Sequence, residues 1–234
     1  MMELLEGRIC ALAALKAGRR KFEALLVRQG IQDESIRDLL DAADALGVPV
    51  KRVREEALDA KAHAKSHGGI VAIAEPLPPS VLPRSTDFIL FLDGIDDARN
   101  LGFALRSAEA FGVQAVLVRR RAWTFDGGDV SRASSGAYER LPVVVGEDVP
   151  PGLALIGCLA GAPKTIYDED LTRPLALAIG GEKRGLSAAV RDRCSSKVSI
   201  PTREGAPSLS LTHAAAVAMA EVARQRRDKM KGGL

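Results

Sequence analysis

The sequence has few aromatic and cysteine residues and no long apolar run. Aromatic residues make up 4% of the 234 positions, and the three cysteines, Cys10, Cys158 and Cys194, are too scattered for a disulfide framework or a paired metal site. No window approaches the roughly 18 uncharged apolar residues of a membrane span. The N-terminus, MMELLEGRIC, has two early acids and lacks the apolar core of a signal peptide. These absences predict a cytoplasmic protein.

An excess of charge of one sign is also absent. Lys and Arg total 33 against 30 Asp and Glu, and the net charge of +3 is too small to indicate a nucleic-acid partner by itself. No G-x-G-x-x-G fingerprint occurs, which excludes the ordinary dinucleotide motif. His63 and His67 are four residues apart, but Ala64 stands where a zincin motif needs Glu, so no metal site is expected. The composition is that of a globular protein of one or two domains.

A proline-rich segment divides the chain. Residues 76–86, PLPPSVLPRST, contain four prolines and predict a stiff linker between a domain at 1–75 and a domain at 87–234. Helical and strand-like patterns alternate in the first domain and indicate a small α/β fold. Its expected elements are helices at Arg8–Lys16 and Asp33–Leu46 and strands at Glu23–Arg28, Val48–Val53 and Gly69–Ala74.

The second domain alternates more regularly. Strands are expected at Asp87–Leu92, Val113–Val118, Leu141–Val145, Leu153–Leu159, Leu175–Ile179 and Lys197–Ile200, with helices at Leu101–Phe111 and Thr212–Arg227. Buried strands that alternate with helices indicate a parallel sheet covered on both faces. Because such sheets bind ligands at the carboxyl ends of their strands, the loops after Leu92, Ile179 and Ile200 are the candidate site.

The first loop, LDGIDDARNLG, leads into a helix. Asn100 is well placed to cap that helix, and Arg106 lies off its buried stripe of Leu101, Leu105 and Ala108. Arg106 is therefore either a ligand-facing cation at the sheet edge or a solvated helix arginine.

The second loop, IGGEKRGLS, is rich in glycine. Gly180, Gly181 and Gly185 offer backbone donors of the kind that bind anions, and Glu182 can anchor the loop. It is not a Walker loop, because Leu186 stands where the phosphate-binding Lys belongs. The alternative is a glycine-rich turn that leads into a helix.

The third loop runs from Ile200 to the C-terminal helix. Ser208 and Ser210 flank Leu209 immediately before that helix. They are candidates for ligand contact, and the alternative is a serine that caps the helix.

Together, in this order and spacing, the three loops resemble the signature motifs of the SpoU (TrmH-type) RNA ribose 2′-O-methyltransferases of the SPOUT class. The matching residues are Asn100-Leu-Gly102-x-x-x-Arg106-Ser-Ala, Gly180-x-Glu182-x-x-Gly185-Leu-Ser, and Ile200-Pro201 through Ser208-Leu209. The segment Ser134–Pro142 resembles the region between the first two motifs. Residues from Glu6-Gly7 to His67-Gly68-Gly69-Ile70 resemble the L30e-like RNA-binding domain of rRNA-directed members.

The resemblance implies an α/β domain with a C-terminal trefoil knot, preceded by the L30e-like domain. It implies S-adenosylmethionine as cofactor, a homodimer, and transfer of methyl to a ribose 2′-OH of structured RNA. The N-terminal domain favours 23S rRNA over the alternative, tRNA. The cofactor-binding residues implied by position are Gly180, Gly181, Gly185, Ile200 and Leu209.

The resemblance also assigns the catalytic group. Arg106 is expected to clamp a substrate phosphate and stabilise the emerging alkoxide, since a guanidinium is almost always protonated. Asn100 would orient Arg106 or the ribose, Glu182 would organise the second loop, and Ser208 would contact substrate or cofactor loop. Ser210 replaces the usual Asn of the third motif, which leaves open a non-catalytic RNA-binding or assembly factor.

Further RNA contacts are expected outside these motifs. Arg119, Arg120 and Arg121 form a cationic run followed by Trp123, which suits RNA phosphate and a stacked base. A solvated charge run is the alternative reading. The resemblance places His67 in the terminal loop of the RNA-binding domain and adds it to the expected RNA contacts.

Overall fold

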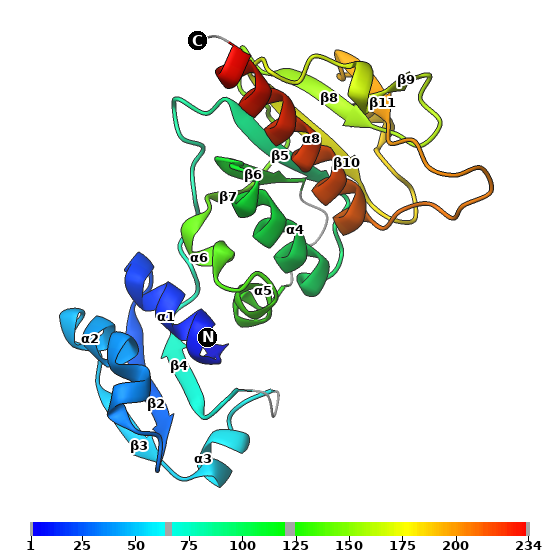
Figure 1. Ribbon diagram of the computed structural model, residues 1–234. Helices are drawn as coiled ribbons and strands as arrows, with labels where there is room; N and C mark the ends of the chain where they lie inside the picture. The colour runs from blue at the N-terminus through cyan, green and yellow to red at the C-terminus, as the bar shows by residue number, and fades with distance from the viewer. Residues whose placement is uncertain (1, 64–66, 120–124, 233–234) are drawn as a thin grey trace. The chain divides into compact units, whose positions relative to one another are not determined.

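Figure 1 shows a computed structural model of the chain, which describes residues 2–63, 67–119 and 125–232. The chain divides into two compact units. Unit 1 comprises Met1–Pro79 and Thr124–Arg140, and unit 2 comprises Ser80–Trp123 and Leu141–Leu234. The linker at 76–86 forms no helix or strand, as its prolines predict.

Unit 1 is built on a four-stranded sheet in the order β1-β4-β2-β3. Its strands are β1 (Glu3–Glu6), β2 (Phe22–Arg28), β3 (Val50–Val53) and β4 (Ile70–Ala74), and its first helices are α1 (Arg8–Ala17), η1 (Asp33–Ile36), α2 (Arg37–Ala45) and α3 (Glu55–Asp59). The sheet is mixed, because β2 runs parallel to β3 and antiparallel to β4. The predicted small α/β fold is confirmed, although β1 and α3 were not expected and the helix predicted at Asp33–Leu46 begins with a 3-10 turn.

Two further helices of unit 1 come from much later in the sequence. These are α5 (Gly127–Ala133), which packs on β1, and α6 (Ala137–Arg140), which packs on α1. Glycines permit the close approach: a Cβ added at Gly128 would lie 2.2 Å from the Leu4 carbonyl oxygen, and one added at Gly136 would lie 2.3 Å from the Ala13 Cβ. The sequence had placed this segment in the second domain, because sequence order does not reveal which unit an inserted segment packs on.

A buried ion pair holds the inserted segment in unit 1. Arg20 and Glu139 have fully buried side chains, and Arg20 donates from Nε and Nη2 to the two Glu139 carboxylate oxygens at 2.8 and 2.9 Å. The Arg20 Nη1 also donates to Glu3 at 2.6 Å. A second pair joins Arg132 Nη1 to the buried Glu6 carboxylate at 2.7 Å. Charged groups are found inside proteins only when paired in this way.

Unit 2 contains a seven-stranded sheet in the order β7-β6-β5-β10-β8-β11-β9. Its strands are β5 (Phe88–Asp93), β6 (Ala115–Val118), β7 (Val143–Val145), β8 (Ala154–Cys158), β9 (Lys164–Thr165), β10 (Leu175–Gly180) and β11 (Ser196–Ser199). All neighbouring strands are parallel, which confirms the predicted sheet. β5 is buried along its whole length, as its continuous apolar run predicts. The trefoil knot stays a prediction.

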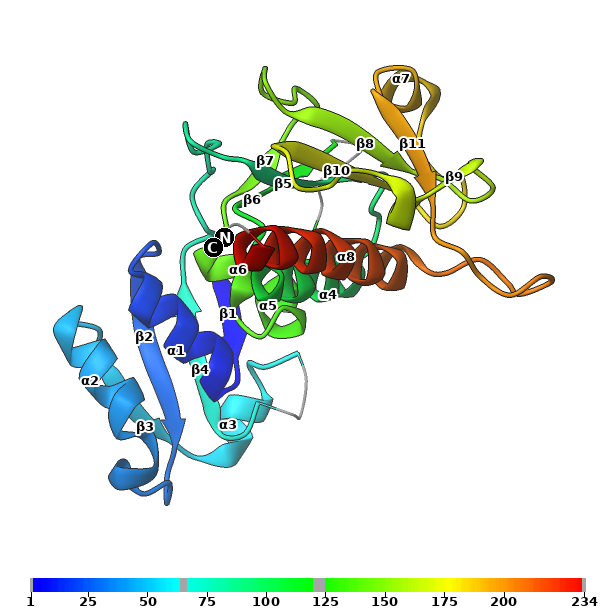
Figure 2. The same ribbon diagram turned by 45° about the horizontal axis from the view of Figure 1, so that its top comes forward.

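The helices of unit 2 are α4 (Ala98–Ala110), α7 (Ala188–Arg191) and α8 (Leu211–Gly232), with a 3-10 turn, η2 (Ile166–Asp168). Figure 2 shows α4 and α8 side by side on one face of the sheet, in agreement with the contacts between them. Within the described residues, no helix is long and apolar enough to cross a bilayer.

Candidate active site

The topology brings the first two predicted loops together. β5 and β10 are hydrogen-bonded neighbours, with Leu92 opposite Ile179 and Asp93 opposite Gly180, so both strands end at one point of the sheet edge. After β5, the chain forms β6 and β7 on one side of this point. The later strands β8, β9, β10 and β11 all lie on the other side, so the strand order changes direction between β5 and β10. Crevices for ligands form where strand order changes direction in this way.

A cavity of about 410 Å³, here called the larger cavity, lies at this edge. It is lined by Cys158–Gly161, Ile179–Glu182, Arg184–Leu186, Arg191, Ile200, Thr202, Ser208, Leu209, Leu211 and Ala214. All five residues expected to bind the cofactor are among them, and so are Glu182 and Ser208. Residues from three separate stretches of the chain, at 158–161, 179–191 and 200–214, therefore line one concave surface.

The loop after β8 also lines the larger cavity, although no local pattern of the sequence indicates it. β8 lies between β10 and β11 in the sheet, so residues 158–161 lie between the second and third predicted loops. Burial raises the pKa of the Cys158 thiol to about 11, which keeps the thiol protonated at neutral pH.

The glycines of the second loop are required by close backbone contacts. A Cβ added at Gly180 would lie 2.1 Å from the carbonyl carbon of Gly185, and one added at Gly181 would lie 2.5 Å from the Gly94 oxygen. The loop closes on itself through a bond of 2.8 Å from the Gly185 N–H to the Gly181 oxygen. Backbone, not side chains, therefore forms this wall of the larger cavity.

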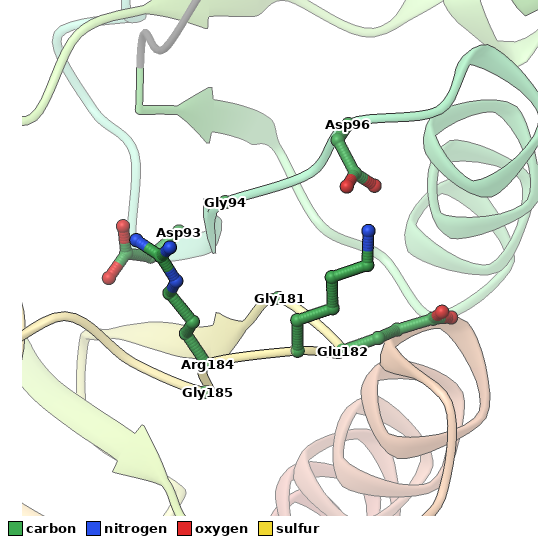
Figure 3. Close-up of a pocket in the computed structure, with 8 residues that line it drawn as sticks. Asp93, Gly94, Asp96, Gly181, Glu182, Arg184 and Gly185 are labelled. Carbon is green, nitrogen blue, oxygen red and sulfur yellow. The ribbon is translucent and has the colours of Figure 1, made fainter.

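A second cavity of about 210 Å³, here called the smaller cavity, borders the same loop (Figure 3). It is lined by Asp93, Gly94, Asp96, Gly181, Glu182, Lys183, Arg184 and Gly185. Four of these, Gly181, Glu182, Arg184 and Gly185, also line the larger cavity. The two cavities thus share the 181–185 loop as a common wall.

Asp93 ties the first loop to the second. Its carboxylate is buried and accepts a hydrogen bond of 2.6 Å from the Ser187 backbone N–H and one of 3.3 Å from Arg119 Nη1. Arg119 donates further to the Ser187 hydroxyl at 2.6 Å and to Glu147 at 2.7 Å. The hydrogen bond to Glu147 is the main cause that raises the Arg119 pKa. Because three partners bind its guanidinium, Arg119 holds the loops together, and its contact with RNA stays a prediction.

The rest of that cationic run cannot be placed. Arg120, Arg121 and Trp123 lie outside the described residues, so their expected contacts with RNA remain predictions.

The first loop differs in one detail from the expectation. Asp97, not Asn100, caps α4, because the Asp97 carboxylate accepts from the Asn100 backbone N–H at 2.8 Å. The freed Asn100 side chain points its amide to Glu182, with Nδ2 3.5 Å from Oε1. This contact joins the first loop to the second across 82 positions of sequence.

Arg106 lies on the solvent-facing side of α4. It belongs to an exposed stripe with Arg99, Phe103 and Ala110, at helical spacings of four and three residues. Within the described part of the chain, its guanidinium makes no hydrogen bond or ion pair, unlike that of Arg119. It is therefore available to an external anion.

The two serines of the third loop have different surroundings. Ser208 lines the larger cavity, whereas the Ser210 hydroxyl accepts a bond of 3.4 Å from the His213 backbone N–H at the start of α8. The same hydroxyl lies 2.6 Å from His213 Nδ1 and 3.0 Å from the Thr212 hydroxyl. Ser210 is thus the helix cap that the alternative reading described.

His67 lies inside unit 1, with a relative exposure of 2%. Its Nδ1 accepts from the Gly69 N–H at 3.0 Å, and its Nε2 lies 2.8 Å from Asp59. Both ring nitrogens are occupied, so the expected direct contact between His67 and RNA is wrong, and the residue orders its loop instead. Among the residues that the structure covers, no group of three His, Cys, Asp or Glu side chains forms a metal site.

Two family models match the chain and together span most of it. The SpoU rRNA methylase family matches residues 87–220, and the RNA 2′-O ribose methyltransferase substrate-binding family matches residues 4–80. The first covers the sheet and loops of the candidate site, and the second covers the N-terminal part of unit 1.

Individual proteins agree with this assignment. The chain is 30% identical to the 23S rRNA (guanosine-2′-O-)-methyltransferase RlmB of Photorhabdus laumondii, with 97% of the chain and 99% of that protein covered. A crystal structure of an RNA 2′-O ribose methyltransferase aligns with a TM-score of 0.82 and 28% sequence identity, and the alignment covers 97% of this chain and 89% of the chain in that structure. The chain also aligns with a crystal structure of the SpoU methyltransferase AviRb of Streptomyces viridochromogenes in complex with S-adenosylmethionine, at 25% sequence identity and a TM-score of 0.79. This alignment covers 97% of this chain and 91% of the AviRb chain. The chain belongs to the SpoU rRNA methylase family and is an RNA 2′-O-ribose methyltransferase that uses S-adenosylmethionine.

Proposed function

We propose that this enzyme methylates the ribose 2′-OH of a guanosine in 23S rRNA, the substrate named for its RlmB relatives. The observation that supports this most is the larger cavity, which gathers the residues expected at the cofactor from the second and third loops. The RlmB relatives, which are named for 23S rRNA and match 97% of the chain, favour rRNA over tRNA.

The larger cavity suits S-adenosylmethionine. Its volume of about 410 Å³ is within the ordinary range of small-molecule sites, roughly 300–1,000 Å³. Its lining combines apolar side chains, from Ile179, Ile200 and Leu209, with the polar backbone groups of Gly180 and Gly181. When bound, the cofactor supplies an electrophilic methyl group on a sulfonium, which becomes a neutral thioether after transfer.

Arg106, in this proposal, binds the phosphate next to the target ribose and stabilises the developing alkoxide. A ribose hydroxyl is a poor nucleophile and must lose its proton as the new C–O bond forms. A fixed guanidinium lowers the energy of the anionic oxygen, and the bound phosphate can accept the proton. The contact between Asn100 and Glu182 fixes the start of α4 against the second loop, which sets the direction of the helix that carries Arg106.

A homodimer in the cytoplasm completes the proposal. Phe103 is 48% exposed in the middle of the stripe on α4, and Val217 is 38% exposed on α8, the helix beside it. Apolar side chains at these positions favour burial against a second copy. Sedimentation tests this: the wild type is expected to be dimeric and Phe103→Glu monomeric, and a monomeric wild type would contradict the dimer.

The identity of the substrate is tested by incubating the enzyme and labelled cofactor with 23S rRNA or with total tRNA. The methylated ribose is then mapped. The expected result is one modified guanosine in 23S rRNA and none in tRNA. Arg106→Ala is expected to abolish transfer and leave cofactor affinity, measured by calorimetry, nearly unchanged. Arg106→Lys is a matched control that keeps the charge but loses the planar fork. Full activity of Arg106→Ala would contradict its role.

A further inference from the structure

The charged side chains around the smaller cavity are left without partners. Asp96, Lys183 and Arg184 are exposed and make no hydrogen bond or ion pair within the described ranges. Glu182 has one long contact, at 3.5 Å, with Asn100. Opposite charges thus line one cavity of about 210 Å³ and do not neutralise one another.

Some other charged groups of unit 2 are paired. Glu169 binds both Lys164 and Arg173 at 2.8 and 2.7 Å, and Arg224 binds Glu221 at 2.7 Å. Opposite charges kept apart around a concave surface indicate a ligand that itself carries both donors and acceptors.

The two ends of the smaller cavity differ in chemistry. Figure 3 shows Asp96 and Glu182 towards one end and Arg184, beside Asp93, towards the other. Since Asp93 is already bonded to Ser187 and Arg119, its carboxylate belongs to the wall. The free groups are therefore carboxylates at one end and a guanidinium at the other, and the Lys183 ammonium is a further free cation of the lining.

We propose that the smaller cavity binds the base of the target guanosine, with Asp96 accepting from N1–H and the N2 amine and Arg184 donating to O6 and N7. This inference rests on the proposed function. Arginine paired with guanine O6 and N7 is the commonest specific contact to that base. A carboxylate suits the opposite donors, because it accepts two parallel hydrogen bonds.

The same groups reject adenine. Adenine N1 is an acceptor and repels the Asp96 carboxylate, while its N6 amine is a donor and opposes Arg184. A site that leaves charged groups unpaired with the wrong base discriminates more strongly than one that loses only apolar contact.

The position of the smaller cavity fits the reaction. The loop 181–185 separates it from the larger cavity, so a base on one side of the loop and the cofactor on the other leave the ribose where the cavities meet. Glu182 lines both cavities at that boundary. The small volume holds a base and leaves the sugar and phosphate outside, towards α4.

The test uses the full-length protein and an RNA fragment around the mapped nucleotide, synthesised with guanosine, inosine, adenosine or 7-deazaguanosine at that position. For the wild type, we expect kcat/KM to fall about 10- to 100-fold with inosine, which lacks the N2 amine, and more with adenosine. Asp96→Asn is expected to lose activity on guanosine and to treat guanosine and inosine alike. Arg184→Met is expected to become insensitive to 7-deazaguanosine, which lacks N7.

Asp148→Asn is the matched control, because Asp148 is an exposed acid of unit 2 that lines neither cavity. It is expected to keep the wild-type preference. Calorimetry with S-adenosylmethionine is expected to give the same affinity for Asp96→Asn and the wild type. A weaker affinity would assign the smaller cavity to the cofactor and overturn the proposal.

The remaining outcomes separate this proposal from the proposed function. Equal wild-type rates on guanosine and inosine, or an Asp96→Asn variant that loses the same factor on both, would overturn base recognition and leave RNA methylation intact. A wild type that methylates none of the RNAs would overturn the proposed function itself.

Discussion

The buried pair of Arg20 and Glu139 decides whether residues 127–140 fold with the N-terminal part of the chain. Both side chains are fully buried, and Arg20 also holds Glu3 and the Glu75 carbonyl oxygen, the latter at 2.9 Å. Glu139→Leu removes both hydrogen bonds that Arg20 donates to the Glu139 carboxylate. The buried guanidinium then keeps one carboxylate partner, that of Glu3. Breaking a buried pair from one side costs about 3–5 kcal/mol of unfolding free energy, a large share of the roughly 5–15 kcal/mol typical of a domain.

The double variant Arg20→Met with Glu139→Leu separates the lost charge pair from lost packing. Replacing both partners by apolar groups removes the unpaired charge, so the double variant is expected to regain most of the unfolding free energy that Glu139→Leu loses. The recovery is incomplete because the Glu3 carboxylate then lacks its partner Arg20. The expected coupling energy between the two substitutions is at least about 2 kcal/mol, which a double-mutant cycle resolves. Asp38→Ala is the control, because the Arg8–Asp38 pair is exposed and its removal is expected to give no measurable change.

Urea unfolding followed by circular dichroism gives the free energies, and hydrogen exchange reports the segment directly. The amides of α5 and α6 are expected to exchange together with those of β1 and α1, and to lose protection together in Glu139→Leu. If Glu139→Leu cost less than about 1 kcal/mol, as an exposed pair does, or if α5 and α6 exchanged independently of β1, the packing of this segment in unit 1 would be refuted.

Three further predictions concern unit 2 and the thiols. Gly180→Ala is expected to lower cofactor affinity at least tenfold in calorimetry, because its Cβ would lie 2.1 Å from the Gly185 backbone, and unchanged affinity would show that the loop adapts freely. Burial raises the pKa of both Cys10 and Cys158 to about 11, so iodoacetamide is expected to label them slowly at pH 8 and quickly after unfolding, and fast labelling of the folded protein would contradict this. Burial raises the pKa of Glu169, but the hydrogen bonds from its neighbours lower it more, to below the ordinary value of 4.5. The stability that Glu169 contributes is therefore complete above about pH 4.5 and lost as the pH falls further, and Glu169→Gln is expected to flatten this dependence of the urea midpoint.

Local patterns predicted the regular elements well where the period was clear. The continuous apolar run at Asp87–Leu92 and the Ala-rich segment at Thr212–Arg227 correspond to β5 and α8. Short elements, such as β9 and α7, gave no comparable signal, because two to four residues hold only about one period of a pattern and no repeat can be recognised.

Site prediction succeeded for loops with an unusual composition and failed for residues whose role depends on a distant partner. The glycines of the second loop could be found because three of them fall within six positions directly after a predicted buried strand. The loop that begins at Cys158 was missed, because only its place in the sheet brings it to the larger cavity. Arg119 was predicted to contact RNA from its cationic run and His67 from the family resemblance, and neither pattern reveals that Asp93 and Asp59 bind them in the fold.

The sequence by itself determined the α/β character of both parts, the parallel sheet and the three loops at its edge, because these follow from hydrophobic period, glycine and proline, which act over a few residues. Only the tertiary structure decided that β10 pairs with β5, that the Cys158 loop joins the site, and that residues 127–140 pack in unit 1. Each of these depends on groups far apart in the chain, such as Arg20 and Glu139 at a separation of 119 positions. Their pairing is set by complementary burial and charge in three dimensions, which no local pattern of the sequence encodes.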